Sequence, residues 1–113
     1  MYRLGVNFDL TYITAGIVDE TGKILIKESI PTLKYRNFEE IVKDMAHLCI
    51  RVADKYGLNI DNDIEFIGIG CYGSTDSKNG TIIYSSYFGF KNVALAKEMK
   101  KYVNIPVYCD NDA

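Results

Sequence analysis

The sequence has no tryptophan, one histidine, two prolines and only three cysteines among its 113 residues. The three cysteines, Cys49, Cys71 and Cys109, lie far apart, and each is set in or beside an apolar stretch. A disulfide framework or a metal site needs paired or clustered ligands, which this spacing does not provide. We therefore interpret all three as small buried hydrophobic residues and expect no metal site within this chain.

The sequence also lacks a long hydrophobic run and an excess of positive charge. No apolar stretch approaches the roughly 20 residues that span a bilayer, and the start MYRLGVNF does not have the layout of a signal peptide. The formal net charge is -2, with lysines and acidic residues interspersed, so no basic stripe is available to neutralise a phosphate backbone. We expect a cytoplasmic protein that binds neither nucleic acid nor a membrane.

What the sequence does contain is typical of one compact globular domain. Hydrophobic residues make up 48% and charged residues 25% of the chain, which is enough for a single core. There are no internal repeats, no low-complexity tracts and no linker that would mark a second domain. We predict that residues 1–113 form one domain.

The first third of the chain predicts a three-stranded antiparallel meander. The β-rich runs YRLGVNF and YITAGIV are separated by Asp9, Leu10 and Thr11. A turn at Thr21 and Gly22 then leads into the third run, KILIKESI.

After Pro31 the hydrophobic period changes to that of a helix. Asn37, with Glu40 three residues later, is typical of a helix N-cap, and Gly57 is typical of a C-terminal stop. The apolar residues that recur at helical spacing are Ile41, Met45, Leu48, Cys49, Val52 and Tyr56.

The remaining sequence predicts two more strands and a second helix. The run IEFIGIG is continuous enough for a buried strand of a parallel sheet, and IPVYC supplies the last strand. Between them lie a turn-rich stretch over residues 73–80, a hairpin or ordered loop in TIIYSSYFGF, and a helix capped by Asn92 that ends near Tyr102. We predict an α/β fold with a mixed five-stranded sheet, helices on both faces, and strand 2–8 beside strand 64–69.

Ligands of open α/β sheets bind beyond the carboxyl ends of the strands. Three segments follow such ends here, residues 7–11, 70–74 and 110–112, and we expect them to converge. Each segment also has a purely structural interpretation: a hairpin turn, a tight loop after a buried strand, and the N-cap of a helix.

Three longer stretches carry a family resemblance. The first stretch, YRLGVNFDLTYITAGIVDETGKIL, is similar to the opening strands of a fold in which these strands flank a phosphate-binding turn. The usual residues of such a turn are an aspartate, an apolar residue, two glycines and a threonine. IGIGCYGSTDSKNGTIIYSSYFGFKNV is similar to a Gly-x-Pro-Gly loop followed by a sugar-side loop, and ALAKEMKKYVNIPVYCDNDA to the run into an acidic-Asn-Asp-Ala motif. In this order they resemble the amino-terminal lobe of the ROK family, sugar kinases and sugar-responsive repressors with the actin-like, ribonuclease-H-like ATPase fold.

The resemblance implies roles for the end of the chain. Asp112 corresponds to the general base that takes the proton from the attacking sugar hydroxyl in these kinases. Asn111 corresponds to the residue that hydrogen-bonds the sugar, while Asp110 replaces a common glutamate and is expected to be supportive. Gly70 and Gly73 would let the backbone approach the sugar.

The phosphate-binding turn departs from the family pattern. Thr11 is retained, but Asn7 stands in place of the leading aspartate, and Asp9 and Leu10 replace the paired glycines. A carboxylate about 4 Å from a phosphate is unfavourable by roughly 4 kcal/mol at a surface-like effective dielectric. ATP and Mg are the cofactors of the intact family, but we expect neither to bind tightly to this chain.

Near the expected sugar pocket, this chain has larger side chains at two positions than the family usually has there. Tyr72 replaces the proline of the Gly-x-Pro-Gly loop, and Tyr87 stands where asparagine is common.

Two classes of function follow from the resemblance. The first is the amino-terminal lobe of an ATP-dependent, glucokinase-like hexose kinase. The alternative is a noncatalytic sugar-binding or transcription-regulator relative with a degenerate phosphate turn, and a domain that serves only assembly is the third possibility. The expected partners are a hexose, a missing carboxy-terminal lobe and a second copy of the chain.

Overall fold

The computed structural model describes the backbone of residues 1–9, 11–33, 37–71, 74–76, 81–85 and 90–111. It also describes the side chains of these residues, except those of residues 71–94 and 110–111. In chain order the elements are β1 (Tyr2–Phe8), β2 (Tyr12–Val18), β3 (Ile24–Pro31), α1 (Phe38–Lys55), α2 (Ile60–Asp63), β4 (Ile64–Cys71), β5 (Ser74–Asp76), β6 (Thr81–Ser85), β7 (Phe90–Ala94), α3 (Leu95–Met99) and β8 (Val107–Asn111).

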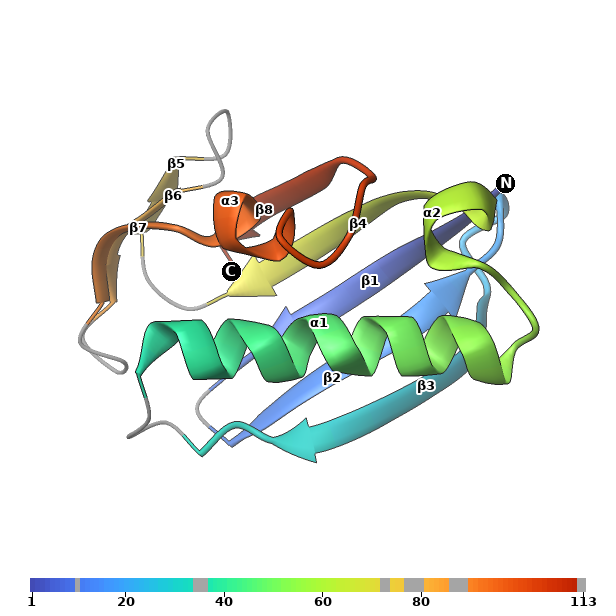
Figure 1. Ribbon diagram of the computed structural model, residues 1–113, viewed down its shortest axis with the longest axis horizontal. Coiled ribbons are helices and arrows are strands. Elements are labelled where there is room, and N and C mark those ends of the chain that lie inside the picture. The colour runs from blue at the N-terminus through green and yellow to red at the C-terminus, as the bar shows by residue number, and fades with distance from the viewer. Residues whose placement is uncertain (10, 34–36, 72–73, 77–80, 86–89, 112–113) are drawn as a thin grey trace.

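The main sheet has five strands in the order β3-β2-β1-β4-β8 (Figure 1). β1, β2 and β3 pair antiparallel as a meander, whereas β4 pairs parallel with β1, and β8 parallel with β4. Short turns suffice for the antiparallel pairs, while the parallel pairs need the crossovers that carry α1 and α3. The predicted mixed five-stranded sheet, with β1 beside β4, is confirmed.

The two longer helices of the described residues cover one face of this sheet. α1 packs against β2 and β3, α3 packs against β8, and the two helices contact each other (Figure 1). We expected helices on both faces, whereas within the described residues α1 and α3 both lie on one face. Both crossovers, β3 to β4 and β4 to β8, move in the same direction across the sheet, and right-handed connections in one direction place their helices on the same side.

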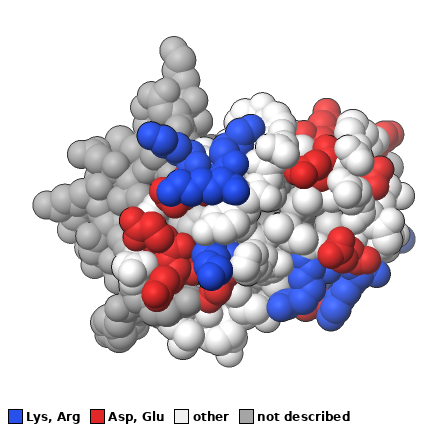
Figure 2. All heavy atoms as spheres, viewed as in Figure 1, with Lys and Arg blue, Asp and Glu red and all other residues white. Residues whose placement is uncertain are grey.

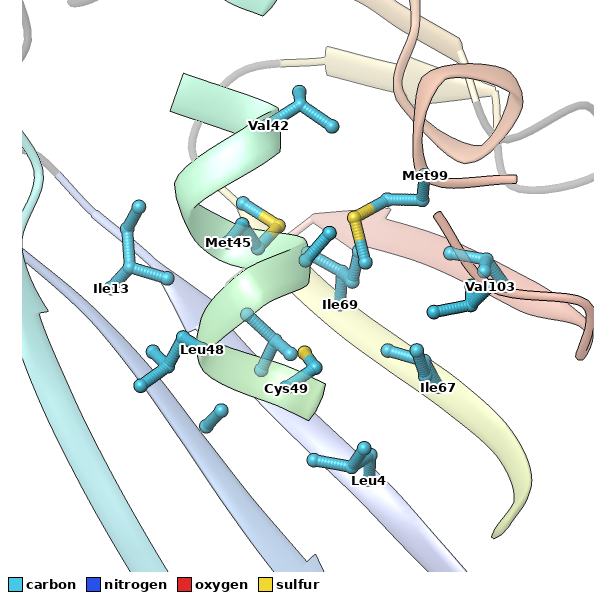
Figure 3. Packing of buried hydrophobic residues seen from close by; sticks show 14 of the residues in the cluster. Leu4, Ile13, Val42, Met45, Leu48, Cys49, Ile67, Ile69, Met99 and Val103 are labelled. Atoms are coloured by element: carbon cyan, nitrogen blue, oxygen red, sulfur yellow. The ribbon is translucent and has the colours of Figure 1, made fainter. Parts of the chain in front are cut away.

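The core lies between this helical layer and the sheet. In β1, Leu4 and Phe8 are buried while Gly5 and Asn7 between them are exposed, which is the alternation of a half-covered strand. Figure 3 shows Met45 of α1 pointing from the helix toward the sheet. The other labelled members of the cluster are Leu4, Ile13, Val42, Leu48, Cys49, Ile67, Ile69, Met99 and Val103.

The boundaries of α1 follow from its capping residues. The Asn37 side chain accepts a hydrogen bond of 2.9 Å from the Glu40 N–H, as an N-cap does. At the other end Gly57 has a φ of +79°, and the Leu58 N–H donates to the Ala53 carbonyl at 2.9 Å. Both predicted ends of this helix are confirmed.

The segment before α3 differs from the prediction. Residues 90–94 pair with β6 as β7, so the hairpin alternative for this region is confirmed and extends to Ala94. The prediction that Asn92 caps the second helix is wrong, because its backbone belongs to this strand. α3 begins at Leu95 and ends at Met99, although turns continue the chain to Val103, whose N–H donates to the Met99 carbonyl at 3.2 Å.

Charges of both signs lie side by side on the helix-bearing face (Figure 2). Glu28 of β3, for example, pairs with Arg51 and Lys55 of α1 at 3.3 and 2.6 Å. Among the described residues, no helix is both long and apolar enough to cross a membrane.

Candidate functional site

The carboxyl ends of three neighbouring strands meet at one edge of the main sheet. Asn7 of β1 is in register with Gly70 of β4, and Gly70 is in register with Asp110 of β8. One position further along, Cys71 is in register with Asn111. The structure therefore brings together the backbones of the three segments that the sequence predicts to converge.

Some of the predicted site residues lie outside the described residues. These are Leu10, Gly73 and Asp112. Asp110 and Asn111 have a described backbone but no described side chain. Their proposed contacts with a sugar therefore stay predictions.

The turn between β1 and β2 is closed by the side chain of Asp9. Its Oδ1 atom accepts hydrogen bonds from the N–H groups of Thr11 and Tyr12, at 2.9 and 2.7 Å. The Asp9 N–H donates to the Tyr12 carbonyl at 3.2 Å. The structural interpretation of this segment as a hairpin turn is thus correct, with the aspartate supplying the acceptor for its amides.

Thr32, the residue after β3, holds the same turn from the side. It is fully buried, its hydroxyl donates to the Asp9 carbonyl at 2.8 Å, and its N–H donates to the Thr11 carbonyl at 2.9 Å. Sequence reasoning missed this residue. Thr32 lies against the turn because the β2–β3 register pairs Tyr12 with Pro31, the residue before Thr32. This register is not visible in the sequence.

The sheet face opposite the helices has a row of glycines across its three central strands. Gly16 of β2 is in register with Gly5 of β1, which is in register with Gly68 of β4. They line a hollow of about 340 Å³ that also contacts Asn7 and Thr14. The sequence pattern had not singled out this row, because its members come from distant parts of the chain.

The cysteines with described side chains are buried, and the described residues hold no cluster of metal-ligating side chains. Burial raises the pKa of the Cys49 thiol to about 12, which keeps it protonated and unreactive at neutral pH. Cys109 is also buried, so the interpretation of these two as core residues is confirmed. Within the described part of the chain, no group of three or more His, Cys, Asp or Glu side chains could hold a metal ion.

A nucleotide phosphate at the β1–β2 turn would need main-chain N–H groups facing it. The N–H groups of Thr11 and Tyr12 instead donate to the Asp9 side chain. A phosphate there would also meet a carboxylate of like charge. The residues present therefore do not fit a nucleotide phosphate at this turn.

Comparison with known sequences gives one consistent result. The sequence model of the ROK family matches residues 3–113. The glucokinase of Thermotoga maritima is 32% identical over 111 residues, which are 97% of this chain and 33% of that protein. The xylose repressor of Caldicellulosiruptor bescii is 24% identical over 110 residues, 97% of this chain and 27% of that protein.

Solved structures agree with the sequence comparison. A ROK family glucokinase from Streptomyces griseus, in complex with glucose and AMPPNP, superposes with a TM-score of 0.85 at 30% identity, covering 100% of this chain and 34% of that one. A ROK family transcriptional regulator gives a TM-score of 0.84 at 21% identity, covering 98% and 28%, which shows the shared fold. The chain thus spans 27–34% of the length of these relatives.

Proposed function

Because this chain belongs to the ROK family, we propose that it is the sugar-facing amino-terminal lobe of a longer protein that binds a hexose. The observation that carries the proposal is the register of Asn7, Gly70 and Asp110 at the carboxyl ends of β1, β4 and β8. This edge is where open α/β sheets bind small molecules. The glucose in the Streptomyces griseus relative supports the choice of a hexose.

In this proposal the end of the chain supplies the polar groups. The amide of Asn111 donates to and accepts from sugar hydroxyls, and the carboxylate of Asp112 accepts the proton of the hydroxyl that reacts. Gly70 and Gly73 leave room for the sugar to approach the backbone. A second lobe closes over the sugar and excludes water, in line with the fraction of its relatives that this chain covers.

The closed turn favours a second candidate function. Asp9 holds two of the N–H groups that a phosphate would need, which supports a protein that binds sugar without phosphorylating it. A repressor among the relatives is consistent with this candidate.

Hexose binding by the intact protein tests the proposal. Calorimetry with glucose, mannose, fructose and N-acetylated hexosamines should give saturable binding that Asn111→Ala removes. Asp54→Asn, on the exposed side of α1, is the matched control and should bind as the wild type does. Absence of binding to every hexose would refute the proposal.

A coupled assay with Mg-ATP then separates the two candidates. Turnover that Asp112→Asn abolishes would identify a kinase, whereas sugar binding without turnover would identify the noncatalytic relative. The 113-residue chain alone should show no turnover, because it lacks the second lobe.

Self-association of this lobe is a further part of the proposal. The sheet face opposite the helices exposes Tyr12 at 53%, Ile24 at 57% and Tyr108 at 54%, and apolar surface of this kind favours association. Sedimentation velocity of the 113-residue chain over a concentration series should show dimers. A monomer at all concentrations would contradict this part.

A further inference from the structure

The sheet face opposite α1 and α3 has a row of glycines that contacts within this chain explain only in part. Gly68, Gly5 and Gly16 are in register across β4, β1 and β2, and none of them has a positive φ. Glycine in the middle of a strand often marks a place where another backbone or a ligand approaches closely. A Cβ atom at Gly16 would lie 3.2 Å from the Ile26 carbonyl oxygen, whereas one at Gly5 would meet nothing within 4 Å and one at Gly68 only an ordinary contact of 3.8 Å. Crowding within the chain therefore accounts for Gly16 but not for Gly5 or Gly68.

We propose that this face is the docking surface for one helix, supplied by the part of a longer protein that this chain does not include. This rests on the proposed function, which takes the chain to be one lobe of such a protein. The chain covers 33% of the Thermotoga maritima glucokinase and 34% of the Streptomyces griseus one, so a protein of that length has about two-thirds of its residues elsewhere. The half of the sheet made by β1, β4 and β8 is parallel, and parallel sheets occur almost only with both faces covered.

The glycine row has the width of a helix. Neighbouring strands lie about 4.8 Å apart, so glycines on three adjacent strands leave a band of about 10 Å, and an α-helix with its side chains is about 10–12 Å across. The three glycines line the hollow of about 340 Å³ on this face. Larger side chains lie at its two sides, Tyr108 of β8 in register with Gly68 and Lys27 of β3 in register with Gly16. A helix that runs along β1 fits between them, with Gly5 beneath its axis.

Apolar side chains border the row toward the amino end of β1. Val18 and Ile24 line the hollow, and Ile24 is exposed. On the β8 side, the rings of Phe66 and Tyr108 meet edge to face with their centroids 5.6 Å apart. A helix that fits this surface has an apolar stripe, which buries these side chains, and polar residues on its outer face. An acidic residue on its flank would complement the charge of Lys27.

The other end of the row reaches the candidate site. Asn7 and Thr14 line the same hollow, and Asn7 is in register with Gly70 at the carboxyl ends of β1 and β4. The docked helix therefore anchors the rest of the protein next to the edge of the sheet that faces the sugar. In the 113-residue chain this face is uncovered, and it is the face through which we expect that chain to self-associate.

Oxidative footprinting of the wild-type proteins tests the proposal without a substitution. Hydroxyl radicals should oxidise Tyr108 in the dilute 113-residue chain, and at least about tenfold more slowly in the intact protein, because a residue under a docked helix reacts only when the helix dissociates. Tyr56, exposed at the end of α1, is the matched control and should react equally in both. Equal oxidation of Tyr108 in the two proteins would overturn the proposal.

Photo-cross-linking then identifies what covers the face. A benzophenone amino acid in place of Lys27, at the side of the row, should cross-link in the intact protein to residues three or four apart within one segment of the same chain, which is the spacing of one helix face. Cross-links to alternate residues would indicate a strand, and cross-links between two copies would indicate a dimer interface. Either result would overturn the proposal.

A larger side chain at Gly5 gives an independent measurement. Gly5→Leu should not lower the melting temperature of the 113-residue chain, where the position is open, but should lower that of the intact protein, where it overpacks the interface. An unchanged melting temperature of the intact variant would count against a helix on the row. None of these measurements uses a sugar, so an intact protein that binds hexose but leaves Tyr108 exposed would refute this inference alone.

Discussion

Replacing each of two glycines in register on β1 and β2 by alanine should change the stability of the fold in opposite directions. Gly5 and Gly16 are in register, and neither has a positive φ, so alanine can adopt the backbone at both positions. A Cβ atom at Gly5 would meet no atom within 4 Å. A Cβ atom at Gly16 would lie 3.2 Å from the carbonyl oxygen of Ile26 and 3.3 Å from the Cβ atom of Lys27.

The magnitudes follow from these contacts. Gly5→Ala should stabilise the fold by about 0.4–1 kcal/mol, because alanine restricts the unfolded chain without disturbing the folded one. Gly16→Ala gains the same entropy but pushes β3 away from β2, and overpacking of this kind costs about 1–3 kcal/mol. At about 4 °C per kcal/mol for a domain of this size, the melting temperature should rise by roughly 2–4 °C for Gly5→Ala and fall for Gly16→Ala.

Urea titration and calorimetry of the two variants, with wild type as reference, give the free energy of unfolding and the melting temperature. Gly68→Ala is a useful third variant, because its Cβ atom would meet only the Phe66 ring at 3.8 Å, an ordinary contact distance. It should behave as Gly5→Ala does. If Gly5→Ala and Gly16→Ala changed stability in the same direction, the spacing between β2 and β3 described above would be wrong.

Three further predictions concern single side chains. Thr32→Val should lower the free energy of unfolding by about 1–3 kcal/mol, because the part-buried Asp9 carbonyl loses the donor that the buried Thr32 hydroxyl supplies. Thr32→Ser keeps the hydroxyl and should cost less in the same urea titration. Cys49 should resist alkylation at pH 8 in the folded chain, because burial raises the pKa of its thiol to about 12. Peptide mapping that finds Cys49 alkylated in the folded protein would contradict this prediction. The hydrogen bond from Lys55 lowers the pKa of Glu28. The pair therefore stabilises the fold fully at pH values above the ordinary glutamate pKa of about 4.3, and this stabilisation is lost as the pH falls through the lowered pKa. Glu28→Gln should flatten that part of the pH dependence of stability, and an unchanged profile would exclude the pair as its source.

The parts of the fold that the sequence predicts well are those set by local chemistry. Asn37 and Gly57 end α1 through contacts within a few residues, and such contacts leave a clear pattern. The alternation of Leu4 and Phe8 with Gly5 and Asn7 likewise identifies β1 as a strand with one covered face.

The parts that the sequence predicts poorly depend on partners far along the chain. Asn92 is a good cap by residue type, but pairing of its segment with β6 determines its conformation. Thr32 and the glycine row acquire their roles only from strand register, which a single sequence does not reveal. The family resemblance identified the candidate site, whereas the closure of its turn by Asp9 required the positions of individual N–H groups.

The position of β1 between β2 and β4 has a consequence for biosynthesis. Val6 pairs with Ala15 on one side, but its partner on the other side, Ile69, is 63 residues later in the chain. At roughly 5–20 residues per second, the ribosome needs about 3–13 seconds to make that partner, and for this time one edge of β1 is unpaired. An unpaired edge is a template for pairing with other chains. Translation speed between β2 and β4 should therefore influence how much of the nascent protein aggregates before β4 closes the sheet.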